Sequence, residues 1–388
     1  MTKDALVSAV RQDVIDWRRH LHQNPELSFQ EHDTARFVQE KLESLTALDV
    51  TRPTPTSVMA RLRTGRPGKV LAIRADLDAL PIEEENDFSF RSQRPGAMHA
   101  CGHDAHTAML LGTAKVLSAM ADELSGEVRF LFQHAEELFP GGADEMIAAG
   151  AMDGVDLVIG AHVWSPLEVG KIGVVYGPAM AGPDTFWITI NGQGGHAAMP
   201  QQTVDPIVVG AQVVSGLQHI VSRAADPLAT LVVSVTQFVA GNTHNVIPAS
   251  AQLQGTVRSF DPALRERIPG LMERFVKGIT EAHGATYDFT YEQGYRVVVN
   301  EPTVTTLVED TVREVLGDDA VDSMKPNMGG EDFSAFQEQA PGCFFFVGAG
   351  NPGKGIVHPH HHARFTVDED ALEVGVKVFV NTACRVLA

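Results

Sequence analysis

The chain has 388 residues, of which 44% are hydrophobic and 20% are charged, so it contains enough apolar material for two or three folded domains. Its 30 basic and 49 acidic residues give a net charge of −19 without a basic stripe, which excludes binding to nucleic acid. No apolar run is long enough to cross a bilayer, and the three cysteines form no disulfide pattern. We therefore expect a cytoplasmic protein that does not bind a membrane.

The first part of the chain predicts strands that alternate with helices. The expected helices cover residues 4–22, 33–45, 105–120 and 143–149. The expected strands cover residues 57–62, 69–74, 127–132 and 156–161. Alternation of this kind is typical of a largely parallel sheet that helices cover on both faces.

The pattern changes after about residue 184. In the order strand, helix, strand, strand, helix, strand, the expected elements are residues 185–190, 205–222, 230–238, 251–258, 262–283 and 287–293. This order is typical of a ferredoxin-like unit, which can bury its own core. Segments rich in glycine and proline bound the unit on both sides.

The elements that follow this unit resemble the first domain again, with a helix at 303–316, an apolar run at 343–347 and a last helix at 368–387. We therefore predict an α/β fold with a discontinuous catalytic domain, residues 1–182 and 296–388, built on a mostly parallel central sheet flanked by helices. Residues 183–295 are predicted to form an inserted ferredoxin-like α+β domain that serves as a lid and for dimerisation.

The strongest local signal for chemistry is the segment Met98–His106, in which Cys101 and His103 stand two residues apart. Their side chains can face the same way only in irregular or extended backbone, which Gly102 permits. A thiolate and an imidazole together suit a borderline-soft divalent cation. The helix expected after them would lower the pKa of the Cys101 thiol and favour the thiolate. A buried cysteine beside helix-capping residues is the alternative interpretation.

Three further segments rich in metal donors belong to the same predicted domain. Glu136 and Glu137 end a strand, where neighbouring side chains diverge, so one carboxylate can bind a metal while the other meets water. His162 also follows a strand, and residues 358–362 include four histidines. Each segment alone can be structural or solvated, but their coincidence in one domain predicts a metal centre.

Asp76 and Asp78 end the strand at 69–74 with a spacing that places both carboxylates on one face. At least one of them can hold the second ring nitrogen of a histidine ligand. A structural turn is the alternative interpretation of this pair.

Seven motifs that occur together and in order reveal a resemblance that covers nearly the whole chain. They are Trp17–Ser28, Arg74–Pro81, Met98–His106, Glu136–Glu137, Gly194–Ala198, Asn245–Pro248 and Gly329–Phe333. The set resembles the metal-dependent N-acyl-amino-acid amidohydrolases, the aminoacylase, hippurate hydrolase and auxin-conjugate hydrolase group of the dinuclear zinc-peptidase clan. The resemblance implies two divalent metal ions per subunit, which can be zinc, manganese, cobalt or nickel.

The resemblance also implies a set of metal ligands. They are Cys101, His103, Glu137, His162 and His361. The family's last ligand is the histidine of an H-x-P-x-F pattern, and Phe365 selects His361 as that histidine. Ala363 stands where the pattern has proline, so His360 or His362 can replace His361.

Further roles are implied for residues outside the ligand set. Glu136 is similar to the family's general base. His196 resembles a lid histidine that stabilises the developing oxyanion, in some relatives across a dimer interface. Asn245 and Arg258 resemble residues that contact substrate, and Arg258 suits a free α-carboxylate because a guanidinium binds it through two hydrogen bonds.

We therefore expect a hydrolase that cleaves the amide bond of N-acyl amino acids, acetyl, benzoyl or similar, with Glu136 taking a proton from a metal-activated water. Its expected partners are the small substrate and a second copy of the chain, bound through the inserted domain. A dipeptidase or carboxypeptidase acting on short peptides is the alternative within enzymes. A non-catalytic protein that binds a metal or an amino acid is the second alternative, against which the presence of Glu136 argues.

Overall fold

The computed structural model describes residues 2–388, which form two compact units. The larger unit extends to Ala179 and includes Val298–Pro326 and Asp332–Ala388. The smaller unit consists of Met180–Val297 with Asn327–Glu331, a second segment that the sequence analysis does not anticipate. No helix within residues 2–388 is both long enough and apolar enough to span a bilayer.

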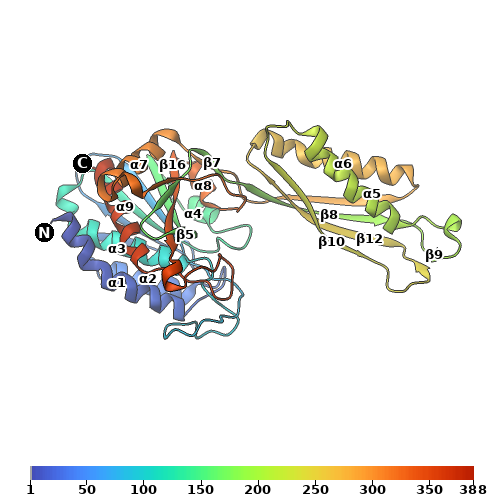
Figure 1. Ribbon diagram of the computed structural model, residues 1–388. Helices are drawn as coiled ribbons and strands as arrows, with labels where there is room; N and C mark the ends of the chain where they lie inside the picture. The colour runs from blue at the N-terminus through green and yellow to red at the C-terminus, as the bar shows by residue number, and fades with distance from the viewer. Residues whose placement is uncertain (1) are drawn as a thin grey trace. The chain divides into compact units, whose positions relative to one another are not determined.

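An eight-stranded sheet forms the centre of the larger unit (Figure 1). In hydrogen-bonding order its strands are β1 (Leu48–Thr51), β2 (Val58–Arg63), β4 (Glu127–Gln133), β3 (Val70–Asp76), β5 (Leu157–Glu168), β16 (Gly342–Gly350), β6 (Ile172–Val174) and β15 (Val321–Ser323). The four central strands β4, β3, β5 and β16 are parallel, whereas β1, β2 and β6 join by antiparallel pairing. The predicted, mostly parallel sheet is confirmed, and its antiparallel additions lie toward the edges.

Helices flank this sheet, as predicted. They are α1 (Lys3–Gln23), α2 (His32–Glu43), α3 (His103–Ala119), α4 (Ala143–Ala148), α7 (Pro302–Leu316), α8 (Phe333–Gln337) and α9 (Asp370–Val386). Helix α3 packs closely between α1 and α9 because Gly112 has no side chain: a Cβ there would lie 2.5 Å from Val14 and 3.1 Å from Val376. Two short strands, β7 (Gly177–Met180) and β14 (Val298–Asn300), pair with each other outside the large sheet.

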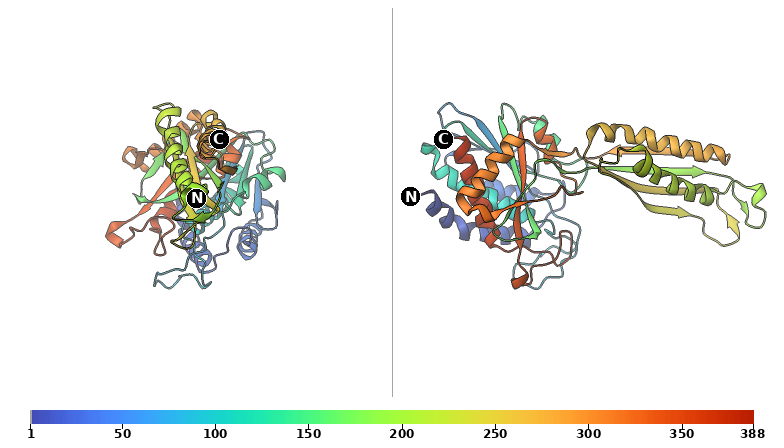
Figure 2. Two further views of the ribbon diagram at one scale, coloured as in Figure 1. Left: turned by 90° about the vertical axis from the view of Figure 1, so that its right-hand side faces the viewer. Right: turned by 45° about the horizontal axis from the view of Figure 1, so that its top comes forward.

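The smaller unit has the predicted ferredoxin-like order of elements (Figure 2). In chain order they are β8 (Gly182–Asn191), α5 (Pro206–His219), β10 (Leu231–Ala240), β12 (Ser250–Ser259), α6 (Pro262–Ala282) and β13 (Thr286–Gln293). The strands form one antiparallel sheet in the order β10-β12-β8-β13, so β10 and β13 are its edges. Phe186, Ile188 and Ile190 alternate along β8 and are buried in the core with residues of α5 and α6.

A short ribbon completes the smaller unit. It pairs β9 (Gly195–His196) with β11 (Val246–Ile247), and His196 lies opposite Val246. The ribbon is connected to β12 by only two residues, Pro248 and Ala249, so it lies at the end of β12 that begins with Ser250.

Candidate metal centre

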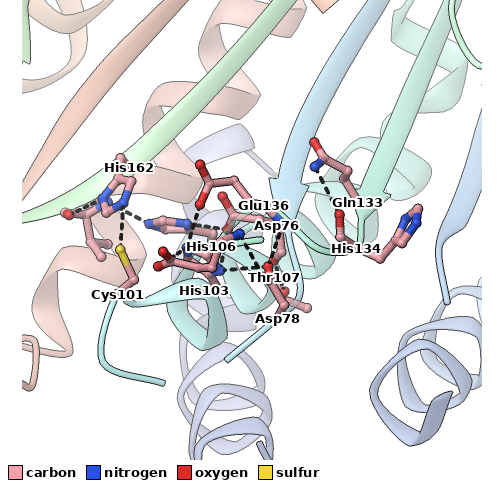
Figure 3. Close-up of polar contacts among 12 residues, drawn as sticks. Asp76, Asp78, Cys101, His103, His106, Thr107, Gln133, His134, Glu136 and His162 are labelled. Carbon is pink, nitrogen blue, oxygen red and sulfur yellow. Dashed lines mark hydrogen bonds and ion pairs between the residues drawn. The ribbon is translucent and has the colours of Figure 1, made fainter. Parts of the chain in front are cut away.

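The carboxyl end of β3 supplies two buried aspartates that orient histidines of α3 (Figure 3). Asp78 Oδ1 lies 3.2 Å from His103 Nδ1, and Asp76 Oδ1 lies 2.6 Å from His106 Nδ1. As expected for at least one of the pair, Asp78 holds the second ring nitrogen of a candidate histidine ligand, His103. The Nε2 atom of His103 then has no hydrogen-bond partner within residues 2–388 and is available to a cation.

Gly102 lets Cys101 and His103 approach the same point, as predicted. Its φ angle is +93°, a conformation that favours glycine, and a Cβ there would lie only 2.3 Å from Val163. Helix α3 begins directly after it, at His103. The donor atoms of Cys101, His103 and Glu137 all lie within 4.8 Å of one another.

The expected lowering of the Cys101 thiol pKa is wrong. Burial raises this pKa well above its ordinary value, and the carboxylates of Glu137 and Glu136 raise it further, so the helix N-terminus does not dominate. A divalent cation among these donors would reverse the effect, because a coordinating thiol is deprotonated. The surroundings of Cys101 therefore suit a metal ligand better than a reactive thiol.

Glu136 and Glu137 follow the end of β4 and are anchored through their backbone. The N–H groups of Glu136 and Glu137 donate to Asp78 at 3.1 and 3.0 Å. The carboxylate of Glu137 joins Cys101 and His103 in one donor group and that of Glu136 belongs to another, so the two carboxylates can hold different roles, as expected. Both carboxylates approach His103 Nε2, at 3.9 Å from Glu136 and 3.8 Å from Glu137.

His162 lies inside β5 and not after its end, because β5 continues to Glu168. Its Nδ1 lies 2.6 Å from the carbonyl oxygen of Val163, which makes Nδ1 the donor and leaves Nε2 as an acceptor. This Nε2 is 3.3 Å from Cys101 Sγ (Figure 3). The strand therefore presents an imidazole nitrogen to the same sulfur atom that faces His103 and Glu137.

The histidine tract contributes two rings to this region. The donor atoms of His360, Cys101 and His162 lie within 4.8 Å of one another. His361 Nε2 lies 3.3 Å from Glu137 Oε1, and its backbone has a φ angle of +65°. The third ring, His362, stacks on His358 with centroids 4.4 Å apart. Nothing in the sequence apart from its position in the tract indicates that His360 approaches Cys101.

These residues fit divalent cations. Sulfur, nitrogen and carboxylate oxygen donors converge in two groups that share Cys101. His103 Nε2 and His360 Nδ1 are buried without a hydrogen-bond partner in the described part of the chain. Buried polar atoms are rarely left unsatisfied, so this convergence indicates a bound cation.

Two residues that the sequence analysis leaves unassigned support the ligands from outside. His106 Nε2 accepts a hydrogen bond of 2.8 Å from the backbone of Val163, the residue after His162. Asp332 accepts hydrogen bonds from Arg74 at 2.9 Å and from Gln133 at 2.7 Å, which ties the ends of β3 and β4 together. In the sequence, only the positions of His106 in the motif Met98–His106 and of Asp332 in the motif Gly329–Phe333 indicate these supporting roles.

The other predicted site residues belong to the smaller unit. His196 belongs to β9 and Asn245 directly precedes β11, where the N–H of Ala197 donates to the carbonyl of Asn245 at 3.1 Å. Arg258 lies near the far end of β12, where its Nη1 donates to the carbonyl of Val257 at 3.0 Å. Arg258 lies eight positions after Ser250, or about 26 Å along a strand. The unit thus brings His196 and Asn245 together but holds Arg258 apart from them.

Three known proteins resemble the chain over most of their length. The N-acyl-L-amino acid amidohydrolase of Geobacillus stearothermophilus is 66% identical over 303 residues, which cover 77% of this chain and 82% of that protein. Thermostable carboxypeptidase 2 of Saccharolobus solfataricus is 42% identical over 374 residues, 95% of this chain and 94% of that protein. The crystal structure of Bacillus subtilis YXEP, a dinuclear metal-binding peptidase of the M20 family, has a TM-score of 0.86 at 38% identity and covers 98% of this chain and 99% of its own.

Residues 72–385 match the family described as peptidase family M20/M25/M40. The match covers well over half of the chain, and the relatives and the solved structure agree with it. The predictions of the α/β fold and of a metal-dependent hydrolase are thereby confirmed. The chain belongs to the peptidase family M20/M25/M40.

Proposed function

We propose that the protein hydrolyses the amide bond of N-acyl amino acids at a centre for two divalent ions, with Glu136 as the general base. One observation carries this proposal: the buried carboxylate of Glu136 lies 3.9 Å from His103 Nε2, the same atom that the carboxylate of Glu137 approaches to 3.8 Å. A protein that only binds a metal has no need for a second carboxylate there. The similarity to an N-acyl-L-amino acid amidohydrolase over 77% of the chain supports the same chemistry.

The ligands that we propose are those that the sequence implies. They are Cys101, His103, Glu137, His162 and His361. Cys101 belongs to both donor groups, which supports a sulfur shared between the two ions. His361 suits an ion bound by Glu137, because the two side chains are 3.3 Å apart, whereas His360 is the alternative nitrogen beside His162.

Divalent ions bound here would supply Lewis acid chemistry, acidifying water and polarising the scissile carbonyl. Glu136 would take the proton from the attacking water and pass it to the leaving amine. The family resemblance assigns His196 to the developing oxyanion, where removal of one donor typically lowers turnover about 10²–10³-fold. Arg258 and Asn245 remain our candidates for contacts with the substrate, Arg258 through its carboxylate.

We propose that the protein acts as a homodimer through the smaller unit, which also serves as a lid. About 26 Å of β12 separates Arg258 from the ribbon of His196 and Asn245, so one small substrate cannot reach all three within a single smaller unit. A second copy can supply the missing contacts. Edge strand β10 supports this proposal, because Phe238 and Val239 on it are 39% and 53% exposed.

Carboxypeptidase activity is the second candidate function, because a 42% identical relative is a thermostable carboxypeptidase. The ion can be zinc, manganese, cobalt or nickel, since the mixed donor set suits each of them. The cytoplasm remains the predicted compartment, in keeping with three unpaired cysteines within residues 2–388.

The decisive experiment reconstitutes the protein with each of the four ions and measures hydrolysis of N-acetyl amino acids, N-benzoyl amino acids and dipeptides, with elemental analysis of the same samples. We expect the N-acyl amino acids to be cleaved fastest. Glu136→Gln should keep its metal content and lose at least about 10²–10⁴-fold in kcat. Cleavage of dipeptides alone would favour the peptidase, and inactivity at full metal content would favour a binding protein.

A further inference from the structure

The turn after β4 has a backbone conformation that alanine rarely adopts. Ala135, the residue directly before Glu136, is buried and has a φ angle of +53°. Within residues 2–388, only three non-glycine residues have positive φ: Phe29, Ala135 and His361. Phe29 contacts the ring of His134, and His361 approaches Glu137, so all three surround this turn or its carboxylates. Backbone strain of this kind persists only where the surrounding structure enforces it.

Two buried carboxylates hold three consecutive backbone N–H groups of this turn. Asp78 accepts from Glu136 and Glu137, as described above. The N–H of Ala135 itself donates to Glu31 Oε1 at 2.8 Å, a contact between residues 104 positions apart in the sequence. Glu31 is therefore the side chain that fixes the strained residue directly.

Glu31 occupies the N-cap position of α2, but its side chain does not cap that helix. The carboxylate of Glu26 does so instead, accepting from the N–H of Thr34 at 2.7 Å. Glu31 is fully buried, and its Oε2 has no hydrogen-bond partner in the described part of the chain. Burial and the neighbouring Asp78 raise its pKa to about 8. Burial of a carboxyl group with one unsatisfied oxygen lowers the free energy of unfolding. Because Glu31 does not cap α2, we look for its role outside that helix.

We infer that Glu31 is a positioning residue: by accepting the N–H of Ala135 it holds the left-handed turn that aims Glu136 and Glu137. The part of the inference that concerns Glu136 rests on the proposed function, which assigns Glu136 as the general base. The part that concerns Glu137 does not, because the orientation of the Glu137 carboxylate affects cation binding whether or not the protein is a hydrolase.

Four variants separate positioning from a general effect on folding. Glu31→Met has a similar length but no acceptor, whereas Glu31→Gln keeps an amide oxygen that can accept from Ala135. Glu26→Met is the matched control, because it also removes a buried carboxylate that accepts a backbone N–H, but on α2 itself. Ala135→Gly, combined with Glu31→Met, removes the conformational cost of a positive φ.

Two quantities are measured. The first is kcat and KM for an N-acetyl amino acid, and the second is the affinity of the metal-free protein for Co²⁺, determined from the absorption spectrum of the bound Co²⁺. We expect Glu31→Met to lower kcat about 10–100-fold with KM nearly unchanged, and to weaken Co²⁺ binding at least about 10-fold, as the loss of a supporting hydrogen bond does at metal sites. Glu31→Gln should stay within about 3-fold of the wild type in both. Ala135→Gly should recover at least about 3-fold of the kcat lost in Glu31→Met.

Equal losses in Glu31→Met and Glu26→Met, or no recovery by Ala135→Gly, would overturn the inference. If Glu31→Met does not fold, Ala135→Val tests the same point with Glu31 intact, because a β-branched residue disfavours positive φ. It must then reduce both kcat and Co²⁺ affinity, and unchanged values would overturn the inference. If the wild type hydrolyses no substrate, the proposed function is refuted but the inference about Glu31 is not. Co²⁺ affinity then still tests whether Glu31 orients the carboxylate of Glu137.

Discussion

Asp78 accepts four hydrogen bonds from residues in and around the candidate centre. Its Oδ1 accepts from His103 Nδ1 and the N–H of Glu136, and its Oδ2 accepts from the hydroxyl of Ser28 and the N–H of Glu137. Asp78→Asn keeps the shape but replaces one of these oxygens with an NH₂ group. The less harmful orientation places that group at the Oδ2 position, where Ser28 can rotate to accept and only the N–H of Glu137 loses its acceptor.

The magnitude of this change follows from these contacts. One buried N–H without an acceptor costs about 1–3 kcal/mol. The remaining hydrogen bonds to Asp78 also weaken, but removal of the buried charge offsets part of that loss. We therefore expect the free energy of unfolding to fall by about 2 kcal/mol. Altered support of His103 and Glu137 should weaken metal binding about 10–100-fold. The pKa of His103, which burial lowers but Asp76, Asp78 and Glu137 together raise to about 10, should fall.

Urea unfolding and titration of the metal-free protein with Co²⁺ measure the two effects. Asp184→Asn is the matched control: Asp184 is also buried and accepts several hydrogen bonds, from Arg265, Tyr291 and the N–H of Gly294, but it belongs to the smaller unit. It should destabilise the protein without changing Co²⁺ affinity. If Asp78→Asn leaves Co²⁺ affinity within about 2-fold of the wild type, the reasoning about Asp78 is refuted.

Three further predictions use other parts of the molecule. His196→Ala should lower kcat about 10²–10³-fold with little change in KM, measured by steady-state kinetics, and a change confined to KM would contradict an oxyanion role. His361→Ala should reduce metal content, measured by elemental analysis after dialysis, more than His360→Ala does; the reverse order would make His360 the ligand. Glu31 should make stability depend on pH, because its carboxyl keeps its proton up to about pH 8 when folded but releases it near 4.5 when unfolded. Between these two pH values the unfolded state binds fewer protons than the folded state. The contribution of Glu31 to the free energy of unfolding is therefore fully present below pH 4.5, and it falls by at most about 1.36 kcal/mol per pH unit as the pH rises to 8. Urea unfolding across this range should show that slope in the wild type and not in Glu31→Gln.

The elements that the sequence predicts well are those with long, regular hydrophobic patterns. The six elements of the smaller unit appear in the predicted order, because strands such as β8 alternate buried and less buried residues over ten positions. Strands β1, β6 and β15 were not predicted, since each has only three or four residues and is formed by pairing with a neighbour.

The donor residues of the centre could be found from the sequence because their side-chain chemistry is unusual, but their electrostatics could not. The Cys101 thiol pKa depends on burial and on Glu136 and Glu137, which are distant in the chain. The hydrogen bond between Glu31 and the N–H of Ala135 could not be predicted for a related reason, because the two residues are 104 positions apart in the sequence. Contacts of this kind exist only after the fold has formed.

The shared sulfur of Cys101 also has a consequence for inactivation. Because one atom contributes to both donor groups, its oxidation or alkylation would disable both of the proposed cation sites in a single event. Carboxylate or imidazole donors in its place would resist peroxide. In the metal-free protein, burial and the raised pKa of the Cys101 thiol would protect it, because the thiolate is the form that such reagents attack.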